Sequence, residues 1–389
     1  MARAARRRAT GTLEQLLAAK EIVICCGSGG VGKTTTAAAA GAMAAARLGG
    51  KVLVVTVDPA RRLANALGLE SFGNVETRVP DSAFAEAGIE CRGELWAAML
   101  DTKQSWDDLV RQHAPDAATR DAILSNPLYT NITGRFVQSH DYIAMERLYE
   151  IHASGRYDLV IVDTPPTRNA LDFLEAPERM ADFFSSRLLR WLTVPYRSRL
   201  VNMATKPFYK VADTILGSAF LEDIAEFFLL FQTMYDGFVE RARAVQRILE
   251  DKRTTFVVVS TLESAPLREA EYFMAALEER RFHLGAVVLN KVLPSYLLDA
   301  DAAEAARRLS ADPDAAAAAL DGIGDQESVA RVIGEVAQSF LNFRVVASRE
   351  AEQRNELGRN PDVLASVPYF DSDIHDLAGL VRLGEQIWR

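Results

Sequence analysis

The sequence predicts an α/β fold, in which helices cover both faces of a mostly parallel, doubly wound sheet. Apolar runs recur along the chain, helical patterns separate most of them, and a glycine-rich motif follows the first run. The runs are continuously apolar rather than alternating, which is typical of strands buried on both faces. They cover residues 21–27, 51–58, 94–101, 157–163, 254–261, 284–291 and 362–368.

Two segments between these runs are too long to be simple crossover connections. They lie at about residues 170–252 and 294–355, and the second contains an alanine-rich stretch. We therefore predict a single domain over residues 16–389, with a helical insertion in the first segment and a mobile helical segment in the second. Arginines cluster within residues 1–15, which we expect to form a flexible basic tail.

The composition excludes several classes of protein. Hydrophobic residues make up 49% of the 389 residues and charged residues 25%, so the chain is not disordered as a whole. No uncharged apolar run reaches the roughly 18 residues that a membrane span requires, so we expect no stable membrane insertion. The net charge of -9 argues against nucleic-acid binding. Three cysteines, two of them adjacent, build no disulfide framework, which favours a cytoplasmic location.

The strongest signal is a phosphate-loop motif, GSGGVGKT, at residues 27–34. It follows a predicted strand and precedes a helix of good formers, which is the context that the motif requires. Its backbone N–H groups would surround phosphate oxygens, and the helix N-terminus adds a positive partial charge. Lys33 would contact the β- and γ-phosphates, and the Thr34 hydroxyl would bind Mg²⁺. The predicted nucleotide-binding residues here are Gly27, Ser28, Gly29, Gly30, Val31, Gly32, Lys33, Thr34 and Thr35.

Two acids end strands that we expect beside this loop. Asp58 follows the second run and Asp163 ends the fourth. In an open parallel sheet the carboxyl ends of the strands face the ligand, and phosphoryl transfer needs one group for Mg²⁺ and another for the attacking water. We assign Asp163 to the metal together with Thr34, and we assign Asp58 and Lys33 to catalysis. Either acid alone would be interpreted as a cap of a strand–helix turn.

The late strand ends in Asn290-Lys291-Val292-Leu293. A GTPase usually carries an aspartate where Leu293 stands, and this aspartate pairs with guanine. The Asn290 amide can pair with adenine, and the stem of Lys291 can cover the ring. The sequence therefore favours ATP over GTP as the bound nucleotide.

With these motifs the chain resembles the arsenite-pump ATPase family, which includes the guided-entry ATPases that deliver tail-anchored membrane proteins. The resemblance also rests on TVDPARRLANALG, IVDTPPT, STLESAPLREAEYF, VVLNKVLP and VPYF, and it spans nearly the whole chain. It implies a P-loop NTPase whose two subunits enclose ATP and open or close with hydrolysis. It also implies nucleotide-site roles for Lys33, Thr34, Thr35, Asp58, Asp163 and Asn290.

One departure from the family concerns charge at the phosphate loop. The family loop reads GKGGVGK, and its first lysine reaches the nucleotide of the partner subunit, whereas this chain has Ser28 there. A serine offers only a neutral hydrogen bond in place of an ammonium. Hydrolysis in a homodimer is then slow, or a paralogous subunit supplies the lysine, or an arginine replaces it. The candidate arginines are Arg61, Arg62 and Arg168.

A second departure concerns thiol and metal sites. Arsenite pumps carry a cysteine cluster and eukaryotic targeting members carry C-x-x-C. Here Cys25 and Cys26 are adjacent on a strand, so their side chains point to opposite faces and cannot share a ligand, and Cys91 stands apart. The histidines show no paired metal spacing: they are His113, His140, His152, His283 and His375.

An apolar pattern over residues 221–249 predicts an amphipathic helix of about thirty residues inside the first insertion. Phe227, Phe228 and Phe231 either pack in the core or line a groove for a hydrophobic client. The function that we favour is a dimeric switch ATPase that uses Mg²⁺ and ATP to handle a protein or membrane client. The alternatives are a slow or inactive nucleotide-dependent scaffold paired with a paralogue, an arsenite-pump subunit, and a positioning ATPase similar to ParA or MinD.

Overall fold

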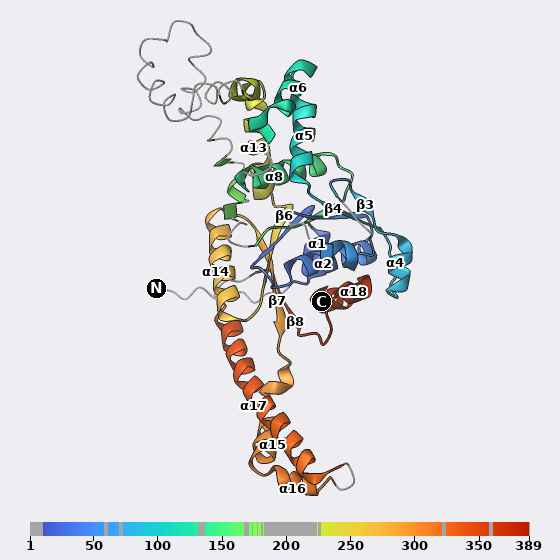
Figure 1. The fold of residues 1–389 in the computed structure, drawn as a ribbon, viewed down its shortest axis with the longest axis vertical. Helices are drawn as coiled ribbons and strands as arrows, with labels where there is room; N and C mark the ends of the chain where they lie inside the picture. Colours follow the sequence, from blue (N-terminus) through green and yellow to red (C-terminus); the bar gives the residue numbers. More distant parts are fainter. Residues whose placement is uncertain are drawn as a thin grey trace, which may run out of the picture.

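The computed structural model describes residues 11–57, 61–69, 73–130, 137–166, 227–320, 324–357 and 361–388, with a few residues between 171 and 182 and residue 224. Its centre is an eight-stranded sheet in the order β3-β4-β2-β5-β1-β6-β7-β8 (Figure 1). The strands are β1 (Ile22–Gly27), β2 (Lys51–Thr56), β3 (Thr77–Arg78), β4 (Glu94–Met99), β5 (Leu159–Asp163), β6 (Thr254–Ser260), β7 (Leu284–Val292) and β8 (Val363–Pro368).

Every neighbouring pair of strands is parallel except the pair of β3 and β4. The predicted fold class and all the predicted strands are therefore confirmed. β3 was not predicted, because its two residues are too few to produce a periodic pattern. β1 lies in the middle of the sheet, between β5 and β6, and β2 lies on the far side of β5. The strand order thus changes direction at β1, and this is where α/β sheets bind their ligands.

The helices near the sheet form two layers (Figure 1). One layer contains α1 (Leu13–Ala18), α2 (Lys33–Arg47) and α18 (Leu377–Trp388), whose apolar side chains share a core with Cys25. The other contains α8 (Val137–Ala153), α13 (Tyr235–Glu250) and α14 (Ser264–Glu279), which share a core with Cys26. The two adjacent cysteines therefore face opposite sides of the sheet, as predicted.

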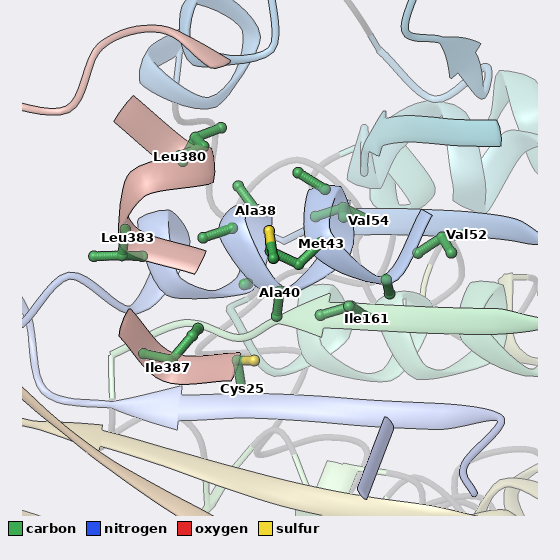
Figure 2. Packing of buried hydrophobic residues seen from close by; sticks show 14 of the residues in the cluster. Cys25, Ala38, Ala40, Met43, Val52, Val54, Ile161, Leu380, Leu383 and Ile387 are labelled. Carbon is green, nitrogen blue, oxygen red and sulfur yellow. The ribbon is translucent and has the colours of Figure 1, made fainter. Parts of the chain in front are cut away.

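The alanine-rich α2 allows α18 to pack closely against it. Figure 2 shows Leu380, Leu383 and Ile387 of α18 beside Ala38, Ala40 and Met43 of α2. A Cβ atom at Gly384 would overlap the Met43 side chain, so the crossing needs glycine at this point. The alanine run that resembles a short apolar span is thus a helix buried between the sheet and α18.

The remaining helices lie mainly toward the two ends of the molecule. They are α3 (Arg61–Ala66), α4 (Asp81–Glu86), α5 (Thr102–His113), α6 (Ala117–Ser125), the 3-10 helix η1 (Ser295–Leu298), α15 (Ala300–Ala311), α16 (Pro313–Ala318) and α17 (Gln326–Glu356). Helices α5, α6 and part of α13 form one projection, and α15, α16 and α17 form another at the opposite end (Figure 1). In the described part of the chain, no helix is long and apolar enough to cross a bilayer.

Two predicted boundaries need correction. The Thr12 side chain caps α1, and Leu13 is buried, so the ordered domain begins before residue 16. The predicted helix over residues 221–249 is not continuous in its described part, because a turn at Thr233 and Met234 precedes α13. Met234 is buried beside Phe231 and Phe238, so the apolar spacing continues across the turn although the helical hydrogen bonding does not.

Candidate functional site

The phosphate loop connects the end of β1 to the start of α2. Gly30 and Gly32 have φ values of 80° and 91°, a region that other residues rarely adopt. At Gly32 a Cβ atom would also overlap the Asn290 side-chain amide. The loop therefore has the backbone shape that the motif predicts, and Asn290 packs directly against it.

Asp163 lies at the end of β5, fully buried beside the start of α2. Its carboxylate accepts a hydrogen bond of 2.6 Å from the Thr34 hydroxyl and one of 3.1 Å from Thr56. The Lys33 side chain is 7% exposed, and its Nζ atom is 3.6 Å from the other Asp163 oxygen. The structure thus brings together the predicted metal pair and the predicted phosphate-binding lysine. A hydroxyl and a carboxylate are the oxygen donors that Mg²⁺ prefers, so these residues fit that ion.

Asn290 and Lys291, at the end of β7, contact the same loop. The Asn290 Nδ2 atom donates to the Val31 carbonyl at 2.8 Å, and its Oδ1 atom accepts from the Lys291 backbone at 2.9 Å. The Lys291 Nζ atom donates to the Gly30 carbonyl at 3.3 Å. The sequence predicted that these two residues contact adenine, which stays a prediction. Their hydrogen bonds to the loop were not predicted from sequence.

A further loop contact was also missed. The Ser28 hydroxyl donates to the Glu269 carboxylate of α14 at 2.7 Å. The order of the strands and helices could have indicated this contact. β6 pairs with β1, Gly27 lies opposite Val259, and α14 begins shortly after β6. A polar residue early in that helix must therefore lie near the loop. The order of the elements does not specify which residue of α14 faces the loop.

Some predicted site residues cannot be placed. Asp58 and Arg168 lie outside the described residues, as do the side chains of Arg61 and Arg62 in α3. The preceding residue, Val57, donates its backbone N–H to the Asp163 carbonyl at 3.1 Å. The roles of Asp58 and the three arginines stay predictions.

The cysteines are poorly suited to bind metal or arsenite. Burial raises the pKa of Cys26 to about 12 and raises the pKa of Cys25 well above its ordinary value. Burial also raises the pKa of Cys91. The reactive and ligating form of cysteine is the thiolate, which these shifts disfavour. Cys25 and Cys26 belong to opposite cores, so they cannot share one ion.

One cluster with metal-ligand geometry was missed, since its members are far apart in sequence. Ligand atoms of His113, Glu146 and Glu150 lie within 4.8 Å of one another. Arg241 forms an ion pair with the buried Glu146, and Arg147 pairs with Glu150 at 3.0 Å. Two guanidinium groups already neutralise these carboxylates, so the arrangement is better explained as a buried ion-pair network than as a cation site.

The chain is similar in sequence to known ATPases. Residues 20–315 match the family model of the anion-transporting ATPases. The chain is 23% identical over 251 residues to a putative arsenical pump-driving ATPase of Chlorobaculum tepidum, covering 64% of this chain and 55% of that protein. It is 26% identical over 248 residues to an ATPase ASNA1 homolog of Entamoeba dispar, covering 63% of this chain and 67% of that protein. Thus the chain spans only about half to two thirds of the length of these relatives.

Proposed function

We propose that this chain, which belongs to the anion-transporting ATPase family, is a Mg²⁺- and ATP-dependent switch that works as a dimer. The observation that carries the proposal is the contact set of Lys33, Thr34 and Asp163 at the end of the central strands. When bound, Mg²⁺ would neutralise phosphate charge. Thr34 and Asp163 would hold it, while Lys33 and the loop N–H groups would bind the phosphates. Asp58 would orient the attacking water.

A protein or membrane client is favoured over arsenite as the species that the switch handles. The support is chemical: the buried thiols of Cys25 and Cys26 face opposite sides of the sheet and have raised pKa values. A soft metalloid needs converging thiolates, and the described cysteines do not converge. The name of the Chlorobaculum tepidum relative refers to an arsenical pump. The name of the Entamoeba dispar relative states no cargo.

A second candidate is a slow or inactive nucleotide-dependent scaffold that pairs with a paralogue. Ser28 favours it, because its hydroxyl is directed to Glu269 and supplies no cation to a partner's nucleotide. The two candidates differ in turnover. Steady-state ATP hydrolysis by the purified chain, with its mass measured in Mg²⁺-ATP, separates a hydrolysing homodimer from a scaffold that needs another subunit.

The nucleotide site is tested by Lys33→Ala with Lys51→Ala as the matched control. Lys33 is buried at the loop, whereas Lys51 has a half-exposed side chain at the start of β2. Loss of the Lys33 charge should weaken Mg²⁺-ATP binding at least tenfold, about 1.4 kcal/mol. Calorimetry that finds equal ATP affinity in the wild type and in Lys33→Ala would overturn the proposal. The Lys51→Ala variant should bind like the wild type.

A further inference from the structure

Two side-chain hydrogen bonds contact the first half of the phosphate loop: Ser28 donates to Glu269, and Lys291 donates to the Gly30 carbonyl. Ser28, only 8% exposed, donates to Glu269 at 2.7 Å. Gly29 and Gly30 are exposed, and a Cβ atom at either position would meet nothing within 4 Å. The second half differs, because Val31 and Thr34 are held by Asn290 and Asp163. Ser28 thus supplies the loop's own side-chain contact within a loosely packed backbone segment.

The position of Glu269 is set by the core. Its helix α14 buries Leu267, Ala270 and Phe273 against the sheet, which fixes the side of the helix that Glu269 occupies. The strand before α14, β6, is in register with β1 up to Gly27. The carboxylate therefore approaches the loop from a rigid element. A hydroxyl donor and a carboxylate acceptor form a charge-assisted hydrogen bond, roughly twice as strong as a neutral one.

The carboxylate also brings negative charge to a site built for phosphates. The same loop region carries the cations Lys33 and Lys291, which contact Asp163 and the Gly30 carbonyl. Like charges repel, and the repulsion grows with the charge of the ligand. ATP carries one more phosphate group than ADP, so Glu269 should disfavour ATP more than ADP.

We propose that Glu269 is a positioning residue of the nucleotide site, which holds Ser28 and whose charge lowers the affinity of the site for ATP relative to ADP. The proposal rests on the nucleotide-binding function proposed above. The Glu269 side chain then has two opposite effects on nucleotide binding. The hydrogen bond orders the loop and favours binding, whereas the charge opposes it.

The variants Glu269→Gln, Glu269→Ala and Ser28→Ala separate these effects. Gln keeps an acceptor for Ser28 and removes the charge, so ATP affinity should rise about threefold at low salt and ADP affinity should rise less. Ala removes both, and it should bind ATP more weakly than Gln. Ser28→Ala keeps the charge and loses the hydrogen bond, so it should bind both nucleotides more weakly than the wild type.

Calorimetry with Mg²⁺-ATP and Mg²⁺-ADP measures these affinities at ionic strengths of about 0.05 M and 0.5 M. The advantage of Glu269→Gln should shrink at the higher ionic strength, which a merely structural effect would not do. Glu279→Gln is the matched control, since it removes an exposed charge from the same helix about 15 Å farther along. It should leave both affinities unchanged.

Each outcome bears on a distinct claim. If the wild type binds ATP and Glu269→Gln matches it at low salt, Glu269 has no charge effect and the inference is wrong. The inference also fails if Glu269→Gln binds ATP more weakly, or if its change does not depend on salt. If neither wild type nor Lys33→Ala binds nucleotide, the proposed function itself fails. Thermal melting of each variant verifies that the compared proteins are folded.

Discussion

The two helical projections of this protein are stabilised by opposite kinds of packing. At one end, α5, α6, α8 and α13 surround an aromatic cluster in which Trp106 contacts Tyr142 and Phe238, with ring centroids 5.9 and 6.1 Å apart. At the other end, α15, α16 and α17 meet along small side chains (Figure 1). The buried residues of that seam are Ala303, Ala306, Ala317, Ala330, Ala337 and Ala347.

The difference decides where apolar surface remains exposed. In the aromatic projection Phe227 and Phe231 are 3% and 4% exposed, so these large side chains are buried in the core. On α17 the alanines face the seam, while Val336 and Phe343 are 63% and 51% exposed. Large buried rings contribute stability through area, whereas an alanine seam contributes mainly through close approach. Of the proposed groove residues, Phe227 and Phe231 therefore belong to the core, and Phe228 is partly buried against it.

The largest effect should follow from opening the aromatic cluster. Phe227→Ser together with Phe231→Ser removes two neighbouring rings, whose centroids are 4.8 Å apart. Each loss should cost about 3–5 kcal/mol, because a cavity is added to the lost burial. Urea denaturation measures the cost. Phe343→Ser on the exposed face of α17 is the control and should change stability by less than about 0.5 kcal/mol. A folded, stable double variant that fails to bind hydrophobic peptides would instead support a client groove.

A smaller effect should follow from overfilling the alanine seam. Ala337 of α17 is 3% exposed in that seam. Ala337→Leu adds bulk where the helices approach closely, which should cost about 1–3 kcal/mol. Ala351→Leu on the same helix lies at a half-buried position and should cost less. Equal melting temperatures for the two variants would show that the seam is loose.

The smallest effect concerns the ion pair of Glu146 and Arg241, which contacts the aromatic cluster at Tyr142 and Phe238. Burial raises the pKa of Glu146, although Arg241 beside it acts in the opposite direction. The folded protein then holds a proton that the unfolded chain has lost, between the ordinary glutamate pKa and the raised value. Stability should therefore fall as pH rises through this window, by at most about 1.4 kcal/mol per pH unit.

Glu146→Gln tests this assignment, because glutamine does not titrate. The variant loses a partner of Arg241 and is expected to be less stable at neutral pH. Its unfolding free energy should nevertheless lack the decline that the wild type shows as pH rises above the ordinary glutamate pKa. Denaturation curves at a series of pH values compare the two proteins. The same slope in both would mean that another group titrates there.

Much of the nucleotide site follows from local sequence. The glycines, Lys33 and Thr34 are adjacent in one motif, so their arrangement depends on a short loop between a strand and a helix. Asp163 could be predicted because a parallel sheet brings strand ends to one edge, and its 2.6 Å hydrogen bond with Thr34 agrees with that prediction. Such residues are placed by backbone geometry, which periodic patterns encode.

Contacts between side chains that are far apart in the sequence could not be predicted, because they depend on which way each side chain points. Glu269 meets Ser28 only because α14 buries its other side against the sheet, and Glu146 meets Arg241 through the packing of α8 against α13. The turn at Met234 interrupts the helix although the apolar pattern continues, because burial in the aromatic cluster tolerates a break in the helix. By itself, therefore, the sequence determined the parallel strands, the phosphate loop and the acid at the end of β5, since neighbouring residues or the common edge of a parallel sheet specify them. Only the tertiary structure decided which side chains from separate elements face each other, because that choice depends on packing among many residues at once.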